Sequence, residues 1–146
     1  MTLHGLVLAS IAALLTVGPA WSQPGADAFD GVWDVHLQCD DARDRAGAVV
    51  KGYVFDFPAE VRAGKLRGQF GDAGQPSSLT LTGTIGPDGE AFLDANGFSG
   101  KPDYTFGHMQ PASPYRYTMR GRFDARGGHA QRVELRRCIA EFARRG

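Results

Sequence analysis

The residues of this sequence best suited to bind a ligand are arginines, and they gather in its C-terminal third. Residues 101–146 hold ten Lys and Arg against four Asp and Glu, whereas residues 23–100 hold six against twelve. A guanidinium group presents a planar fork of donors that matches carboxylate and phosphate oxygens. The zero net charge of the chain therefore conceals an acidic part and a basic part. The basic part is the candidate for binding an anion.

Five of these arginines are expected on two neighbouring strands. Alternate residues of Tyr115–Asp124 face the same way, which predicts an outward face carrying three of them, and the other two are expected on the hairpin partner of this strand. The five are Arg116, Arg120, Arg122, Arg132 and Arg136. They are candidates for a patch that binds an anionic ligand or an anionic surface. The alternative is a solvated sheet face whose arginines pair with the acidic part of the chain.

The stretch from Gly97 to Pro114 is the second candidate site. It is long for a connection between strands, and it carries aromatic residues among Gly and Pro. Loops with aromatic side chains at the mouth of a barrel often contact a ligand, which makes Tyr104, Phe106 and His108 candidate ligand-binding residues. The alternative is that these rings cap the core.

Sequence motifs for catalysis and for metal binding are absent. The three histidines beyond residue 22 are not spaced i, i+2 or i+4, and no H-E-x-x-H, C-x-x-C, G-x-S-x-G or phosphate-binding loop occurs. Arginines interrupt the acidic run Asp40–Asp44, which favours a solvated loop over a calcium site. We therefore assign no catalytic residue, no metal and no cofactor.

The first 22 residues have the character of an export signal. They contain no Asp, Glu, Lys or Arg, and Gly5–Val17 is an apolar run too short to span a bilayer comfortably. Small residues precede the expected cleavage between Ser22 and Gln23. We expect the mature chain, residues 23–146, to be exported to the periplasm or the extracellular space without a membrane span. A retained membrane anchor is the alternative.

Composition limits the class of the mature chain. The full sequence of 146 residues, with 42% apolar residues and no net charge, fits one folded domain and excludes a uniformly basic protein that coats nucleic acid. We expect a monomer whose partner is a small or anionic ligand or another protein. The only two cysteines, Cys39 and Cys138, are expected to form a disulfide, because oxidising compartments favour such bridges. Two reduced structural thiols are the alternative.

The elements that must position these residues are β-strands. Leu79–Ile85 alternates apolar residues with threonine, the turn Gly86–Gly89 follows, and Ala91–Ala95 alternates again, so this segment predicts a hairpin. Gly31–Cys39 alternates in the same way and predicts the first strand. A disulfide from this strand to the last one agrees with a closed barrel, in which the two strands are neighbours.

Further strands follow the same period of two. They are Val49–Phe57 with a bulge or break at Pro58, Val61–Phe70 with a tight turn inside it, Tyr115–Asp124, and Val133–Phe142 with a bulge near Arg136–Arg137. A short helix remains open for Cys39–Ala48 and for Ala140–Arg145. Seven to nine short strands with sequential hairpins predict an all-β fold, a single antiparallel up-and-down barrel, with a β-sandwich as the alternative.

The start of the first strand, Gly31-Val32-Trp33, resembles the G-x-W opening of lipocalin- and avidin-like barrels. The resemblance implies that Gly31 and Trp33 are structural and that the tryptophan plugs one end of the barrel. It also implies that Arg136 or Arg137 lies across the indole, an arrangement that contributes about 0.5–2 kcal/mol.

A longer resemblance begins at Phe29–Val35, which reads F-D-G-V-W-D-V and is followed by a cysteine, a G-Y strand and a final C-x-x-x-F. This pattern is similar to small exported bacterial proteins that start F-D-G-x-W-x-V, which implies export and the fold but no chemistry. Small periplasmic metalloprotease inhibitors of bacteria are similar in size, export signal, barrel and G-x-W start.

Together these features favour a non-catalytic binding protein. The first alternative is a protease-inhibitor-like interaction module that uses loops on a filled barrel. The second is a hydrolase whose site is assembled from distant residues. Interior volume separates these functions best, because a small barrel packed solid with side chains disfavours ligand binding.

Overall fold

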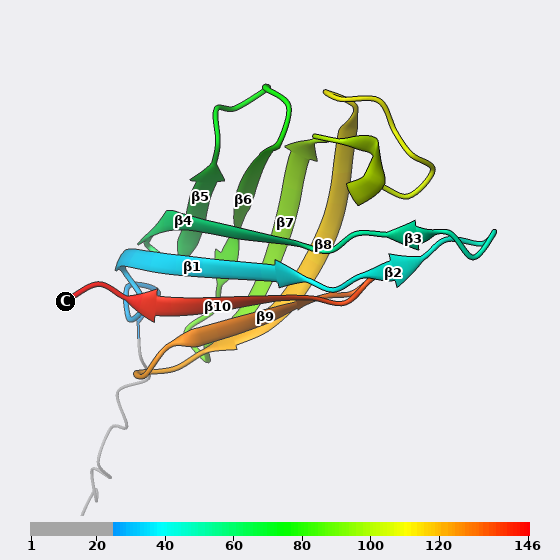
Figure 1. Ribbon diagram of the computed structural model, residues 1–146. Helices are drawn as coiled ribbons and strands as arrows, with labels where there is room; N and C mark the ends of the chain where they lie inside the picture. Colours follow the sequence, from blue (N-terminus) through cyan, green and yellow to red (C-terminus); the bar gives the residue numbers. More distant parts are fainter. Residues whose placement is uncertain (1–24) are drawn as a thin grey trace, which may run out of the picture.

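Eight antiparallel strands close into a barrel in residues 25–146, the part of the chain that the computed structural model describes (Figure 1). Each strand pairs with the next along the chain, and the last pairs with the first. The strands are β1 (Gly31–Cys39), β4 (Tyr53–Arg62), β5 (Lys65–Phe70), β6 (Ser78–Ile85), β7 (Glu90–Phe98), β8 (Pro114–Phe123), β9 (Gly128–Arg132) and β10 (Cys138–Arg144). The predicted up-and-down barrel is confirmed, and the sandwich alternative is wrong.

The predicted export signal, residues 1–22, and its cleavage between Ser22 and Gln23 lie outside the described residues. From residue 25 onward, the structure has no helix that is long and apolar enough to cross a membrane.

The hairpin of β6 and β7 forms as its sequence predicts. Gly89 closes the turn with a φ of 84°, a backbone conformation that glycine adopts without strain. A Cβ at this position would also lie 2.1 Å from the carbonyl oxygen of Phe123. The turn therefore needs glycine for two reasons, its backbone conformation and its close approach to β8.

A small second sheet lies beside one end of the barrel (Figure 1). Its strands β2 (Ala42–Arg43) and β3 (Val49–Val50) form a ribbon between β1 and β4, so the single strand predicted for Val49–Phe57 is wrong. The chain leaves the ladder at Lys51 and Gly52, where a Cβ on the glycine would lie 2.3 Å from the Cys39 carbonyl oxygen. The helices left open for Cys39–Ala48 and Ala140–Arg145 are also wrong, since both segments contain strand.

Two expected irregularities are placed differently in the structure. β4 runs without a break through Pro58, which has a strand neighbour on one side only, because the pairing with β5 begins at Ala59. Proline is tolerated in such an edge-like position. Instead of a bulge near Arg136–Arg137, the five residues 133–137 leave the ladder between β9 and β10, with Leu135 at a φ of 55°.

Trp33 closes one end of the barrel. Its side chain is 1% exposed, its Nε1–H donates to the Phe29 carbonyl at 3.0 Å, and Phe123 meets it edge to face at 5.2 Å. The guanidinium over its ring belongs to Arg144, at 5.0 Å, rather than to Arg136 or Arg137. The reason is the register, because antiparallel pairing of β1 with β10 sets Trp33 opposite Arg144.

The predicted disulfide joins the first and last strands of the barrel. Cys39 ends β1 and Cys138 begins β10, the two residues are paired in register, and their sulfur atoms are bonded. Neither cysteine is exposed by more than 3%. Because Cys39 ends β1 and Trp33 lies near the beginning of that strand, the bridge lies at the end of the barrel opposite Trp33.

The interior of the barrel is filled from the Trp33 end through its middle. Leu37, Leu81, Leu93 and Met119 are each at most 2% exposed and form part of one continuous core. At the disulfide end the inward positions carry large rings that are only partly buried. They are Tyr53, Phe55, Phe70 and Tyr115.

Candidate ligand-binding site

The end of the barrel opposite Trp33 contains a pocket of about 830 Å³. The beginnings of β4 and β8, the end of β9 and the connection between β7 and β8 surround it. Aromatic side chains make up much of its wall: Tyr53, Phe55, Tyr104, Phe106, Tyr115 and Tyr117. The barrel is thus filled at one end and hollow at the other.

The alternation along β8 places two tyrosines inside the pocket. Tyr115 and Tyr117 both face inward, with their ring planes 7° apart and their centroids 6.2 Å apart. Gly97 faces inward on the neighbouring strand β7, and a Cβ there would lie 2.4 Å from the Tyr115 ring. Glycine at this position therefore lets the tyrosine lie across the inner face of β7.

The connection between β7 and β8 covers one side of the pocket mouth. Ser99, which is 2% exposed, holds this segment together, because its hydroxyl donates to the Gln110 carbonyl at 2.6 Å and accepts from the Ser113 N–H at 3.0 Å. The segment includes a single 3-10 turn, η1 (Pro102–Tyr104). Its chain is therefore tied back on itself in a fixed shape.

Two of the three aromatic and histidine residues singled out in this connection line the pocket. Tyr104 and Phe106 do, and Tyr104 is 37% exposed, so it does not cap the core. His108 is exposed and is not part of the wall, whereas Met109 is. His108 has a φ of 47° and lies in the turn that follows Phe106.

Arg136 lies inside the mouth of the barrel and not on the hairpin partner of β8 where it was expected, because β9 ends at Arg132. It is 5% exposed, and its terminal nitrogens donate to the carbonyl oxygens of Lys51 and Tyr104, both at 2.7 Å. Its guanidinium also lies 5.4 Å from the Tyr53 ring centroid and 5.0 Å from that of Phe106. Because residues 133–137 leave the ladder, the alternation of the strand does not apply to this arginine.

Arg132 also faces the pocket and not the outer face. It pairs with Met119, which is 1% exposed, so both side chains lie on the inner side of their strands. Its guanidinium carbon is 4.3 Å from the centroid of the Tyr117 ring. The register of β8 and β9 thus places this arginine inside, a register that the sequence alone leaves undetermined.

The charged residues that line the pocket are all positive. They are Lys101, Arg116, Arg132 and Arg136, of which Arg116 faces outward and pairs with Asp94, and no Asp or Glu lines the pocket. Burial raises the pKa of the Tyr117 hydroxyl, and likewise that of Tyr115, so both remain neutral donors.

Three buried polar atoms at this site have no hydrogen-bond partner among residues 25–146. They are Tyr117 Oη, Arg132 Nε and Arg136 Nε. Unsatisfied buried donors are uncommon in folded proteins and each carries a desolvation cost. All three belong to residues of the pocket wall, which marks this end of the barrel as the place where polar groups are left free.

The arginines predicted to face outward on β8 are already engaged there. Arg116 pairs with Asp94 at 2.8 Å, and Arg122 lies 3.6 Å from Glu90. Arg120 lies 5.5 Å from the ring centroid of Phe92, which is also exposed. The outer face thus corresponds to the alternative in which arginines pair with the acidic part of the chain.

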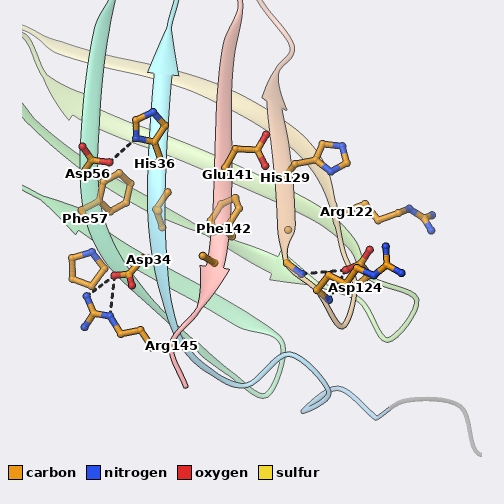
Figure 2. A pocket seen from close by; sticks show the side chains of 16 residues that line it. Asp34, His36, Asp56, Phe57, Arg122, Asp124, His129, Glu141, Phe142 and Arg145 are labelled. Carbon is orange, nitrogen blue, oxygen red and sulfur yellow. Dashed lines mark hydrogen bonds and ion pairs between the residues drawn. The ribbon is translucent and has the colours of Figure 1, made fainter.

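A second hollow, of about 860 Å³, lies on the outside of the barrel (Figure 2). A row of paired residues crosses it from strand to strand, in the order Asp56, His36, Glu141, His129 and Arg122. His36 Nδ1 lies 2.6 Å from a carboxylate oxygen of Asp56. The acidic and basic side chains of this hollow balance one another's charge. None of the buried polar atoms without a partner in residues 25–146 belongs to the hollow.

Two further contacts in this outer hollow are visible in the same view. Arg145 donates from Nε to Asp34 at 2.9 Å, and Asp124 accepts from the backbone N–H groups of Arg126 and Gly127 (Figure 2). Within residues 25–146, no three His, Cys, Asp or Glu side chains converge in a way that could hold a metal ion. We therefore regard the barrel mouth as the stronger candidate site.

Comparison of the chain with known proteins gives no guide to its function. No protein family profile, no curated protein and no solved structure matches it. The geometry of the barrel mouth is accordingly the basis for the functional argument.

Proposed function

We propose that this protein is an exported, non-catalytic binding protein that holds a small apolar ligand in the open end of its barrel. The observation that carries this proposal is the pocket of about 830 Å³ opposite Trp33, walled by aromatic rings. Ligand sites in proteins are concave, mostly apolar and lined by a few placed polar groups. A barrel filled along its whole length would instead favour the inhibitor-like module.

Export is part of the proposal and rests on three features. The first 22 residues have signal character, the start at Phe29–Val35 resembles that of small exported bacterial proteins, and the only two cysteines are joined. Disulfides persist in oxidising compartments such as the periplasm and the extracellular space. We therefore place the binding function in one of these two compartments.

The neutral fluorescent probe phenylnaphthylamine is expected to bind the purified protein saturably, with one site per chain. Replacing Phe106 by alanine should weaken this binding by about 10- to 100-fold, because burial of a phenyl ring against a ligand contributes about 1.5–3 kcal/mol. Fluorescence titration measures both dissociation constants. The matched control is Phe92→Ala, which removes an exposed phenyl ring from the outer face of β7 and should leave binding unchanged.

Two results of this titration would overturn the proposed function. One is the absence of saturable binding to a protein whose circular dichroism shows the folded barrel. The other is an equal loss of affinity in the two alanine variants, since that would place the probe on the outer surface.

A further inference from the structure

We propose that the natural ligand of this pocket is an apolar organic anion, whose negatively charged head lies against Arg132 near the floor of the barrel mouth. The inference rests on the binding function proposed above and names the chemical class of ligand. Carboxylate, sulfonate and phosphate heads share the relevant chemistry, which is a compact group of acceptor oxygens.

The two inner arginines lack the counter-ions that several exposed arginines have. On the outside, Arg62, Arg116, Arg122, Arg137 and Arg145 each have a carboxylate within 3.6 Å. In the described part of the chain, neither Arg132 nor Arg136 forms an ion pair, although Arg136 is 5% exposed. A desolvated charge without a partner is costly, and a bound anion would remove that cost.

The two inner guanidinium groups also repel each other. Burial, and to a smaller degree the charge of Arg132, lowers the pKa of Arg136. Hydrogen bonds from Thr118 and, less, the charge of Arg132 lower the pKa of Glu134, but this carboxylate forms no ion pair with either arginine within residues 25–146. An anion between the pocket rings and these arginines would relieve the repulsion.

The two inner arginines differ in which of their donors are free. Arg136 already gives its terminal nitrogens to the carbonyls of Lys51 and Tyr104, so its role is to fix the mouth and to add positive potential. Arg132 donates to no acceptor among residues 25–146 and stacks on the Tyr117 ring. Stacking on an aromatic face leaves the edge of a guanidinium fork open to acceptor oxygens. Arg132 is therefore the residue available to the anionic head.

Two probes of the same ring system test this directly. Anilinonaphthalene sulfonate carries a sulfonate that phenylnaphthylamine lacks, so the ratio of their dissociation constants isolates the effect of charge. We expect the sulfonate probe to bind about 10- to 100-fold more tightly, the range that one or two hydrogen bonds to a charged group provide. Raising the salt concentration should weaken only the charged probe.

The variant Arg132→Gln should remove most of the advantage of the sulfonate probe over the neutral probe, so the ratio of the two dissociation constants should fall toward one while Arg136 keeps a smaller remainder. Arg132→Lys keeps the charge without the fork, and its ratio should fall between those of the wild-type protein and Arg132→Gln. The matched control is Arg120→Gln, which removes the same charge from the outer face of β8 and should change neither affinity. Thermal melting of each variant verifies that it is folded.

The possible outcomes separate this inference from the proposed function. Equal binding of the two probes by the wild-type protein would overturn the anionic ligand and leave the binding function standing. Equal losses of sulfonate affinity in Arg132→Gln and Arg120→Gln would also overturn it, since they would indicate a general effect of surface charge. Failure of the neutral probe to bind at all would count against the binding function itself.

Discussion

Replacing Cys39 and Cys138 together by alanine is expected to lower the free energy of unfolding by about 3–5 kcal/mol. The two residues are 99 positions apart, and their bond joins the first and last strands of the barrel. A cross-link over so long a span restricts the unfolded chain, an effect of about 4.7 kcal/mol for a loop of 100 residues when treated as chain entropy. Urea denaturation measures the change, and the melting temperature should fall by roughly 10–20 °C.

Reduction of the wild-type protein provides the matched control for this prediction. A reductant should lower the melting temperature of the wild-type protein to that of the double variant and leave the double variant unchanged. Both forms should keep the circular dichroism of the barrel at room temperature, because β1 and β10 remain paired over seven residues of each strand. A wild-type melting temperature that does not respond to reductant would contradict the role given to this bond.

Replacing Trp33 by alanine is expected to cost a similar amount, about 3–5 kcal/mol. The indole is almost completely buried, donates a hydrogen bond to the Phe29 carbonyl, packs against Phe123 and carries the guanidinium of Arg144. The alanine variant loses all of these contacts and leaves a cavity at the closed end. Urea denaturation followed by circular dichroism measures the loss without relying on tryptophan fluorescence.

Two companion variants keep this prediction decisive if the alanine variant does not fold. Trp33→Phe retains part of the buried ring and should lose less stability than alanine. Val32→Ala, on the exposed face of the same strand, should cost less than about 1 kcal/mol. Equal losses at Val32 and Trp33 would contradict the description of this end as a packed plug.

The two ends of the barrel divide stability from binding. The Trp33 end and the middle are filled with side chains, so they supply the buried apolar area that holds the sheet closed. At the other end the disulfide, the contacts of Ser99 and the hydrogen bonds of Arg136 fix the mouth without filling it. A variant at Trp33 that still folds should therefore keep its affinity for the neutral probe.

The fold was predictable from the sequence where a local signal coincided with the final register. Leu79–Ile85 alternates cleanly and is followed by a turn that needs Gly89, so the hairpin could be located without other information. The disulfide was predictable because an oxidising compartment favours joining the only two cysteines, and closure of the barrel makes their strands, the first and the last, neighbours. The hairpin depends on residues that are close together in the chain, whereas the pairing of the cysteines depends on closure of the whole barrel.

The site was less predictable because it depends on where the ladder ends. The period of two predicts one strand over Val133–Phe142 that carries Arg136, but the backbone leaves the ladder after Arg132 and turns through Leu135 at positive φ. The partners of Arg136 are the carbonyls of Lys51 and Tyr104, 85 and 32 residues away in the chain. Backbone carbonyls leave no signature in the sequence, so only the folded structure identifies these contacts.

The arginine over Trp33 was assigned wrongly for a related reason. The resemblance to lipocalin-like barrels pointed to an arginine late in the chain, and the candidates were Arg136 and Arg137, whereas Arg144 lies over the ring. The pairing of Cys39 with Cys138 sets the register of β1 against β10, and this register alone brings Arg144 to the tryptophan while Arg136 lies at the opposite end. The resemblance therefore indicated the correct residue type, an arginine, but only the strand pairing identifies its position in the chain.

The most direct test of ligand binding in the barrel mouth is to map the backbone amides that respond to the neutral probe by two-dimensional nitrogen–proton NMR. We expect the shift changes to cluster at the mouth, around Tyr53, Phe106 and Tyr117, and to be absent around His36 and Glu141 in the outer hollow of Figure 2. Changes confined to that outer hollow, or no saturable changes at the mouth of the folded protein, would contradict it.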